Sequence, residues 1–560
     1  MRPLPSGIPD ISIPLSALAD KLVRALPLWP MGLEEPGLAR HLSARALTSG
    51  DVDLAACGFG LALWGWQRAP LERARVELLV QAAQAVSPPS PVGLFAHNLF
   101  ATLEAWSPGP EEADELAALL VSGQSALIVR TLLPLVRQPV RGFGWLAAAW
   151  DGLLRLGAPE LACAVLDSCP WPAELKPLRA RLSAEVDFLY SSPEVCLGTL
   201  GSVNEPLFGL WTNYLRAELL LRQGELKRGQ NELAQVFAAL PWHTHLGLKL
   251  HGLAAQQPLA PASATANAVI LVYSWNKAEL VRQTLESLAG TDFGSARVLC
   301  LNNGSTDGTG EVMEACAALF PAGALRVIHL PVNVGAPAAR NWLLAQPEVR
   351  AAEWAVFLDD DVLLPPAWLR RLLGAGMADA ACSVAGCRIV SATPPSCLQS
   401  ADYHLFLPDG QPKTFRDLPE NIVVFDNCAG ALDVGLFTYA RPATHVSGCC
   451  HALRSSVLAE LGGFDIRFSP TQFDDLDRDI RSAVAGRPAV YAGDVVVEHV
   501  QHSSLARAKG PAAMGQVLGN KMKLEGKYTQ VEVDGAARRG LDALHTDMKR
   551  KWAELGPLFS

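Results

Sequence analysis

The sequence predicts an all-α helical-repeat domain followed by an α/β domain with a mostly parallel, Rossmann-like sheet. The first 255 residues read as short helices, rich in Leu and Ala, with few strand signals. Pro, Ala, Ser and Thr without periodicity follow, as in a linker. Apolar runs then alternate with helical segments, which is typical of a parallel sheet covered by helices. We therefore expect a helical domain at 1–255, a linker at 256–266, a sheet domain at 267–505 and, at 506–560, a helical tail that could act as a lid.

The composition excludes several classes of protein. Hydrophobic residues make up 50% of the chain and charged residues 18%, as in globular proteins, and 560 residues are too many for one hydrophobic core. The formal net charge of −9 argues against nonspecific nucleic-acid binding, which needs a basic surface. The 12 cysteines are scattered, which favours reduced, mostly buried thiols over a disulfide framework.

No segment reads as a signal peptide or a membrane span. Asp10, Asp20, Lys21 and several prolines interrupt the apolar stretches near residue 1. No uncharged apolar run reaches the roughly 18 to 20 residues that a membrane-spanning helix needs. We therefore expect a cytoplasmic protein.

The helical half shows a weak internal repeat of about 34 residues, the length of a helix-turn-helix unit. In each unit, a turn residue is followed five positions later by a small residue, where two helices must touch closely. The pairs are Gly157 with Ala162, Ser191 with Cys196, and Gly224 with Gly229. The pattern resembles tetratricopeptide repeats but lacks most of their aromatic positions, and a plain helical bundle is the alternative.

In the second half, each strand of the expected sheet has a helix after it. The expected strands are 269–273, 297–301, 326–330 and 354–358, and the helices between them begin at Lys277, Gly310 and Pro337. Because ligands collect at the carboxyl ends of the strands of such sheets, the residues that follow each strand are candidates for the functional site.

Polar and aromatic residues follow the first two strands. Trp275 either packs in the core or offers a flat surface to a nucleobase, and Asn276 is explained equally well as a helix cap. Asn302 and Asp307 lie in a stretch of turn-forming residues that could also present amides to a base edge.

Three consecutive carboxylates, Asp359 to Asp361, follow the fourth strand directly. Adjacent carboxylates at a buried strand end repel one another, so a positive charge should lie beside them. A hard divalent ion such as Mg²⁺ or Mn²⁺, bound together with a diphosphate, satisfies this need. The alternative is a solvated acidic helix start.

Further chemical groups occur near the end of this half. Asp474 and Asp475 begin an expected helix, where the helix dipole alone explains carboxylates and where one of them could serve as a general base. His499 ends a strand and is a candidate metal ligand. Cys449 and Cys450 are adjacent to each other, which favours core packing over a zinc site.

The segment 269–499 resembles a family 2 glycosyltransferase with the GT-A fold. The motifs occur in the family's own order along about 230 residues. They are VILVYSWNK at the first strand, LNNGSTDGT after the second, NVGAPAARN before the third helix, then FLDDD, GCCHALR, GGFD, FDDLD and the terminal VVVEH.

The resemblance implies a binding site for a nucleotide-sugar donor. Trp275 matches the aromatic residue that stacks on the base, and Asp360 matches the carboxylate beside the ribose. Asn302 replaces the family's usual aspartate, which leaves the identity of the base open. The predicted donor-binding residues are Tyr273, Trp275, Asn276, Asn302, Asp307, Arg340, Asp359 and Asp360.

The resemblance also implies a metal site and a catalytic base. Asp361 matches the principal ligand of Mn²⁺ or Mg²⁺, Asp359 completes the DxD motif, and His499 matches an additional ligand. Asp475 matches the catalytic base, with Asp474 in place of the family's glutamate. Similarity to the family thus implies a single displacement with inversion.

Two other functions fit parts of the sequence, and the acceptor is open. A nucleotidylyltransferase shares the sheet and the acidic site but needs a glycine-rich loop after the first strand, where this chain has YSWNK. A protein-binding helical scaffold with a decayed transferase domain is the non-enzymatic alternative. We expect the acceptor to be a protein, such as a bacterial surface or appendage protein, or a glycan or lipid-linked molecule, docked on the helical domain.

Overall fold

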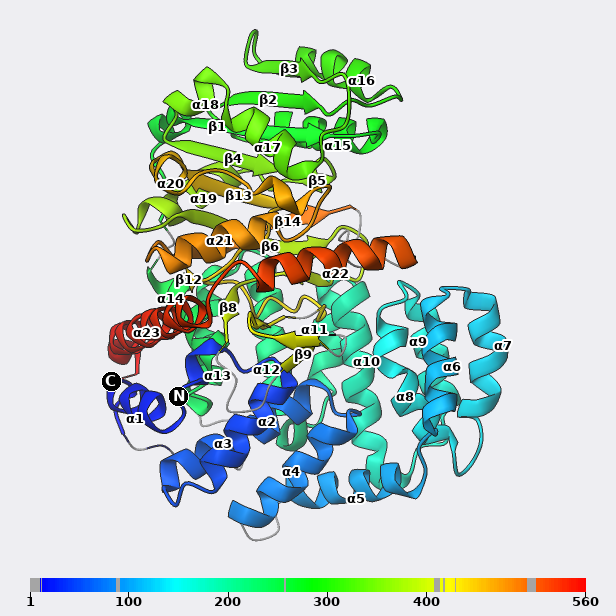
Figure 1. Ribbon diagram of the computed structural model, residues 1–560. Coiled ribbons are helices and arrows are strands. Elements are labelled where there is room, and N and C mark those ends of the chain that lie inside the picture. The colour runs from blue at the N-terminus through cyan, green and yellow to red at the C-terminus, as the bar shows by residue number, and fades with distance from the viewer. Residues whose placement is uncertain are drawn as a thin grey trace.

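The structure, a computed structural model, confirms the predicted fold class. Figure 1 shows an all-helical region in which the chain begins and a sheet flanked by helices that follows it. The sheet belongs to the mixed, mostly parallel GT-A type. The described residues are 11, 13–86, 91–255, 258–406, 413–415, 418–428, 430–500 and 510–559.

The helical region contains turns at the positions that the repeat predicted. Gly157, with φ of 69°, lies between α8 and α9, and Gly224, with φ of 79°, lies between α12 and α13. A Cβ at Gly229 would lie 2.6 Å from the Leu221 side chain, so α12 and α13 approach too closely there for a larger residue. The tetratricopeptide-like assignment itself stays a prediction. The helices are α1 (Leu15–Ala25), η1 (Trp29–Met31), α2 (Pro36–Leu47), α3 (Val52–Arg68), α4 (Arg73–Val86), α5 (Pro91–Ala105), α6 (Pro110–Val121), α7 (Ser125–Val136), α8 (Gly142–Leu154), α9 (Pro159–Ser168), η2 (Ala173–Leu175), α10 (Lys176–Tyr190), α11 (Pro193–Gly201), α12 (Glu205–Arg222), α13 (Leu226–Ala239) and α14 (Thr244–Ala255).

The central sheet has the strand order β12-β14-β6-β13-β4-β1-β2-β3. β3, β2, β1 and β4 are parallel, β13 runs antiparallel between β4 and β6, and β14 is parallel to β6. The strands are β1 (Ala268–Ser274), β2 (Arg297–Asn302), β3 (Leu325–His329), β4 (Trp354–Leu358), β5 (Val362–Leu363), β6 (Val384–Ser391), β7 (Leu398–Ser400), β12 (Ala440–Ala443), β13 (Cys450–Arg454) and β14 (Ala489–His499). Two small antiparallel sheets pair β8 (Tyr403–Leu405) with β11 (Val424–Asp426) and β9 (Lys413–Phe415) with β10 (Leu418–Glu420).

Helices follow the strands where the sequence placed them. The predicted starts at Lys277, Gly310 and Pro337 each lie within one residue of a helix start. The helices of this half are η3 (Ala262–Asn267), α15 (Ala278–Ala289), α16 (Thr309–Cys316), η4 (Ala317–Leu319), α17 (Ala336–Leu344), α18 (Pro347–Ala351), α19 (Trp368–Met377), α20 (Ser455–Leu461), η5 (Ile466–Phe468), α21 (Asp474–Val484), α22 (Pro511–Glu525), α23 (Gln530–Leu555) and η6 (Gly556–Leu558).

Part of the segment interpreted as a linker packs against the sheet domain. Ala260 is buried, and its N–H donates to the Arg370 carbonyl of α19 over 3.0 Å. Thr265, in η3, is fully buried as well. Residues 256 and 257 lie outside the described residues.

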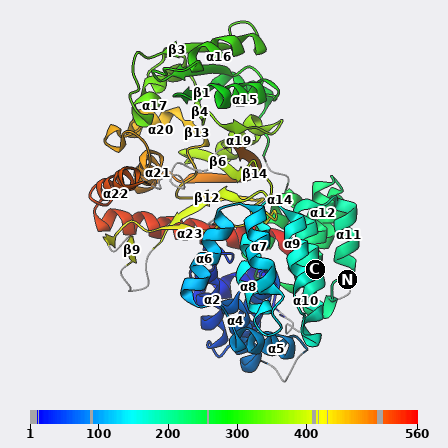
Figure 2. The same ribbon diagram turned by 90° about the vertical axis from the view of Figure 1, so that its right-hand side faces the viewer.

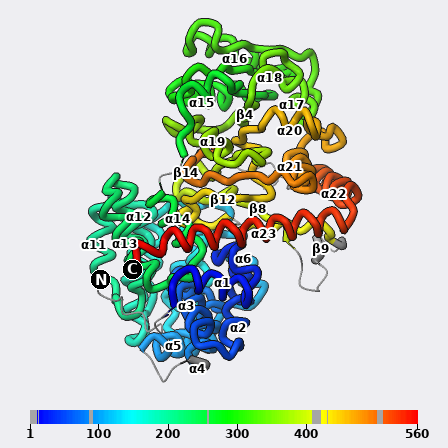
Figure 3. Tube along the Cα trace, turned by 90° about the vertical axis from the view of Figure 1, so that its left-hand side faces the viewer, coloured from blue at the N-terminus to red at the C-terminus, as the bar shows by residue number. Residues whose placement is uncertain are grey.

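Buried residues of both halves belong to one hydrophobic cluster, and two further clusters lie in the second half alone. Figures 2 and 3 show α23 running from the sheet side to the helical region, and one cluster of buried residues includes both halves. The buried Arg441 of β12 donates to the carbonyls of Pro30, over 2.5 Å, and Met31, over 2.7 Å. Lys249 of α14 donates to the Gly435 carbonyl over 2.7 Å. The helical region therefore covers buried polar groups of the sheet domain.

The tail suggested as a lid is held by other contacts where it is described. Lys521 of α22 donates to Glu420 and to the Ile422 carbonyl, and Lys523 donates to the Arg467 carbonyl. Residues 501–509, which include Arg507 and Lys509, lie outside the described residues.

All 12 cysteines fall within the described residues and are free thiols, as the sequence predicted. Ten of the cysteines are buried in the two larger apolar clusters, Cys397 is half-buried, and Cys163 is exposed. Over the described ranges, no helix has the length and apolar character needed to cross a membrane.

Trp552 tests the shared core, because this fully buried residue of α23 packs edge-on to Trp29 with ring centroids 5.4 Å apart and donates to the Pro241 carbonyl. We expect Trp552→Ala to lower the free energy of unfolding by about 3 to 5 kcal/mol. We also expect both halves to unfold in one transition. Urea unfolding followed by circular dichroism and tryptophan fluorescence measures both effects.

The matched control is Trp342→Ala, since Trp342 of α17 is 49% exposed. This change should alter stability by no more than about 0.5 kcal/mol. Equal effects of the two substitutions, or a helical half that unfolds separately, would show that the cores are independent.

Candidate functional site

The carboxyl ends of β1, β4 and β14 meet at one edge of the sheet. Asp359 follows β4 directly, and its N–H donates to the Cys449 carbonyl, just before β13, over 2.8 Å. β14 ends at His499, which pairs with Val362 of β5. Sheet hydrogen bonds therefore fix the backbone on which the predicted metal ligands stand.

Cationic side chains of the protein face the three consecutive carboxylates. Lys277 Nζ lies 2.8 Å from Asp360 Oδ1 and 3.0 Å from Asp361 Oδ2. His499 Nε2 lies 2.8 Å from the other oxygen of Asp361. The positive charge that the sequence assigned to a divalent ion is thus supplied in part by Lys277 and His499.

The pKa values reflect this arrangement. Burial opposes ionisation of Asp361, but His499 and Lys277 outweigh it, so the pKa of Asp361 lies below its usual value. Burial raises the pKa of Asp359 to about 6, against the opposing charge of Arg340. Burial would lower the pKa of Lys277, but Asp360 and Asp361 raise it above the ordinary value. Asp361 and Lys277 are therefore both charged at neutral pH.

Arg340 joins the carboxylates after β4 to those that begin α21. Its Nη1 donates to Asp474 Oδ2 over 2.6 Å, and its Nη2 lies 3.8 Å from Asp359 Oδ1. The guanidinium also lies over the Tyr273 ring, 5.4 Å from the centroid. Since Arg340 and Asp474 are both buried, this pair fixes α17 and α21 relative to each other.

Asp475 is half-buried at the start of α21. Its Oδ2 accepts from Gly448 N over 3.0 Å, and its Oδ1 accepts from Leu476 N over 2.8 Å. Burial alone would raise the pKa of Asp475. The charges of His445 and Arg340 and the hydrogen bond from the Leu476 N–H outweigh burial and lower the pKa to about 2. Asp475 is therefore ionised at neutral pH.

The predicted donor side is formed by the turns after β1 and β2. Trp275, in the turn after β1, is 49% exposed. Asn276, with φ of 52°, accepts from Thr306 N over 2.8 Å and donates from its own N–H to Ser305 Oγ over 3.0 Å. Asn276 thus ties the two turns together and supports the backbone on either side of Trp275.

Asn302 and Asp307, the other two predicted residues of these turns, each accept a hydrogen bond from an N–H of the loop after β2, and Asn302 also contacts β3. Asn302 Oδ1 accepts from Ser305 N over 3.0 Å, and its Nδ2 lies 3.1 Å from His329 Nδ1. Asp307 is exposed and accepts from Thr309 N over 3.0 Å at the start of α16. Both residues therefore stabilise the conformation of the loop after β2.

The residues present fit a divalent ion. Gln399 Oε1 can only accept, so the 2.6 Å bond to His499 Nδ1 makes that nitrogen the donor. When His499 releases its other proton, the lone pair of the ring lies on Nε2, facing Asp361. An imidazole oriented by a second side chain in this way is characteristic of metal-binding histidines.

No role in this site followed from the sequence for Lys277, Gln399 or Cys449. Lys277 was expected only as a helix start and as part of YSWNK, although its position four residues after Tyr273 places it at the same sheet edge. Gln399 is distant in sequence and carries no recognisable signal. Cys449 was assigned to packing.

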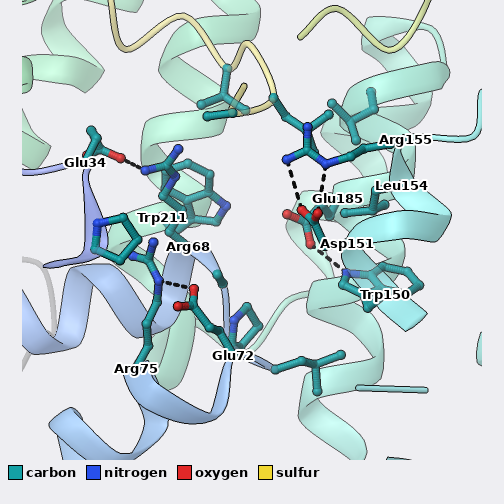
Figure 4. Close-up of a pocket in the computed structure, with 18 of the residues that line it drawn as sticks. Glu34, Arg68, Glu72, Arg75, Trp150, Asp151, Leu154, Arg155, Glu185 and Trp211 are labelled. Carbon is teal, nitrogen blue, oxygen red and sulfur yellow. Dashed lines mark hydrogen bonds and ion pairs between the residues drawn. The ribbon is translucent and has the colours of Figure 1, made fainter. Parts of the chain in front are cut away.

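A separate hollow of about 510 Å³ lies between the helical region and the loop after β11. Figure 4 shows Trp150 and Arg155 on one side of it and Arg68, Arg75 and Trp211 on the other. The arginines pair with acids: Arg68 with Glu34, Arg75 with Glu72, and Arg155 with Asp151.

Comparison with protein families identifies the domain that carries the sheet site. Residues 266–509 match the family model described as glycosyltransferase like family 2. These residues, less than half of the chain, contain a family 2-like glycosyltransferase domain. No protein in the curated set matches the chain.

Several solved glycosyltransferase structures are similar to parts of the chain. GalNAc-T7 with UDP, GalNAc and Mn²⁺ is 14% identical with a TM-score of 0.34, and the match covers 44% of this chain and 45% of that one. The mannosyltransferase PcManGT from Pyrobaculum calidifontis with GDP-Man and Mn²⁺ is 18% identical with a TM-score of 0.34, over 59% of this chain and 88% of that one. S. aureus TarS 1–349 with UDP-GlcNAc is 15% identical with a TM-score of 0.31, over 48% and 70%. The chain thus spans less than half of GalNAc-T7.

Arg340→Ala tests the bridge between the acidic segments. The change leaves Asp474 buried without its partner, so we expect a loss of about 3 to 5 kcal/mol in the free energy of unfolding. Urea denaturation measures the loss. Arg326→Ala is the control, because Arg326 pairs with Glu348 at the surface and such pairs contribute about 1 kcal/mol or less. A loss no larger than that of the control would contradict the bridging role.

Proposed function

We propose that this chain transfers a sugar, with inversion, from a nucleoside-diphosphate sugar to a hydroxyl group of an acceptor. The observation that carries the proposal is the pairing of Asp361 with a Gln399-oriented His499 at one sheet edge, within the domain that matches the family. Asp475, ionised and joined to the same edge through Arg340, supplies the second group that such a transfer needs.

The donor lies across the carboxyl ends of β1 and β4 in this proposal. The exposed Trp275 stacks on the base, with Tyr273 and Asn276 supporting its turn. Asp360 accepts from the ribose. Asn302 and Asp307 hold the loop that borders the base, and Arg340 lies beside the phosphates.

Asp359, Asp361 and His499 hold the divalent ion, Mn²⁺ or Mg²⁺, in the proposed complex. When bound, such an ion neutralises charge that develops on a departing diphosphate. Lys277 is placed to compensate Asp360 and Asp361 whether or not the ion is present, because it bonds one oxygen of each. The remaining oxygen of Asp361 faces His499.

Asp475 accepts the proton of the attacking hydroxyl. The hydroxyl oxygen forms a bond to the anomeric carbon from the side opposite the diphosphate, the bond to the diphosphate breaks, and the proton passes to Asp475. Gly448 and Leu476 each donate an N–H to Asp475, which fixes the carboxylate for this transfer.

A protein or glycan acceptor docked on the helical region completes the proposal, with residues 1–255 selecting the acceptor and 267–505 holding the chemistry. The hollow of Figure 4 supports this role, because its two tryptophans and its paired charges offer apolar and polar contacts together. The helical region also contacts the sheet domain directly through Arg441 and Lys249, so the surface that selects the acceptor is packed against the domain that holds the chemistry.

Nucleotide-sugar hydrolysis by the whole chain tests the proposed activity. We expect Mn²⁺-dependent release of nucleoside diphosphate from one member of a panel of UDP- and GDP-sugars, measured by ion-exchange chromatography. Asp361→Ala should abolish this release and the stabilisation by Mn²⁺ plus nucleoside diphosphate in a thermal shift. Asp292→Ala, an exposed acid on the loop before β2, is the control. Undiminished release by Asp361→Ala would contradict the metal assignment.

Asp475→Asn separates binding from chemistry. Asparagine keeps the size of the side chain but cannot take a proton, so we expect unchanged affinity for nucleoside diphosphate and a fall in transfer of about 10² to 10⁴-fold. Isothermal titration measures the affinity, and product formation measures the transfer. Near-normal turnover would assign the proton to another group, Asp474 being the nearest in sequence.

A further inference from the structure

A cysteine lies among the side chains of the proposed metal site. One ligand atom each of Asp359, Cys449 and His499 lies within 4.8 Å of the other two. Asp359 follows β4, Cys449 precedes β13, and His499 ends β14. A carboxylate oxygen, a thiol sulfur and an imidazole nitrogen therefore converge at the edge where the donor is proposed to bind.

The sheet fixes this convergence. The Asp359 N–H donates to the Cys449 carbonyl, and pairing of β4 with β13 continues from Leu358 and Cys450. Cys449 N donates to Ser447 Oγ over 3.2 Å. Backbone hydrogen bonds therefore hold the segments that carry Asp359 and Cys449, and His499 is itself part of β14.

Burial and access also fit an ion. Cys449 and His499 are buried, with 6% and 8% exposure, whereas the side chain of Asp359 is 29% exposed. Two ligands are therefore shielded from solvent, and the third opens an entry path. Asp361 Oδ1, at 2.8 Å from His499 Nε2, lies beside the trio as a further oxygen.

The donor set differs from one built for a hard ion. Mg²⁺ and Mn²⁺ prefer oxygen ligands, whereas thiolates select softer ions such as Zn²⁺. A nitrogen, a sulfur and carboxylate oxygens together suit Zn²⁺ or Co²⁺ in four-coordinate geometry. A sulfur ligand at this position would therefore favour Zn²⁺ or Co²⁺ over Mg²⁺.

We propose that Cys449 is a ligand of the divalent ion at this site and makes the site bind Zn²⁺ and Co²⁺ through sulfur. On binding, the thiol proton passes to solvent and a sulfur–metal bond forms. The proposal rests on the proposed function only in using the same edge of the sheet, and metal binding is measurable without a donor or an acceptor.

Cobalt absorption tests the proposal directly. We expect Co²⁺ added to the whole chain to produce a sulfur-to-cobalt charge-transfer absorption in the near ultraviolet, and Cys449→Ser to remove it. We also expect Cys449→Ser to weaken Zn²⁺ binding, measured by competition with a chromophoric chelator, at least about tenfold. The affinity for Mn²⁺ should change much less, since Asp361 and His499 remain.

Two variants control for other thiols and for folding. Cys450→Ser removes the neighbouring thiol, which is hydrogen-bonded to the Cys387 thiol. Cys163→Ser removes the exposed thiol. Both should keep the absorption. Cys449→Ala, checked by its melting temperature without metal, guards against a folding defect in the serine variant.

Absence of the absorption from the unaltered chain overturns the proposal, as does its persistence in Cys449→Ser and Cys449→Ala. Loss of the absorption in Cys163→Ser assigns it to a surface thiol and also overturns the proposal. Mn²⁺-dependent donor hydrolysis reports separately on the proposed function. A chain that binds Co²⁺ through Cys449 but hydrolyses no donor refutes that function and leaves the metal ligand intact.

Discussion

Three consecutive carboxylates at the carboxyl end of β4 are the constraint on which the site depends. Asp359 to Asp361 can stand together at a largely buried strand end only if positive charge surrounds them. Lys277, Arg340 and His499 supply that charge from three different elements. The packing of α15, α17 and β14 around the end of β4 is therefore tied to the electrostatics of the site.

The same charges connect the site to the rest of the molecule. Arg340 donates to Asp474 at the start of α21. This contact fixes α21, and with it the proposed base Asp475, relative to the proposed metal ligands. Arg441 reaches the carbonyls of the helical region. An acceptor held on the helices would thus be positioned relative to the donor by a continuous packed core.

The sequence predicted the fold well because local patterns determine it. The runs at 269–273 and 354–358 became β1 and β4 with bounds that differ by at most one residue, since a buried parallel strand is a continuous apolar run. The family resemblance assigned Asp361 and His499 to one metal site, and the two side chains lie 2.8 Å apart. The sequence did not predict the contacts of Lys277 or the position of the Cys449 sulfur, because these depend on side-chain direction and on residues distant in sequence.

A crystal structure of the chain grown with Mn²⁺ and a nucleoside diphosphate tests the central claim most directly. The account predicts an anomalous manganese peak within about 2.0 to 2.4 Å of Asp361 and His499, with the diphosphate on the ion and the base against Trp275. Manganese bound elsewhere, or a nucleotide away from the carboxyl end of β4, would contradict it.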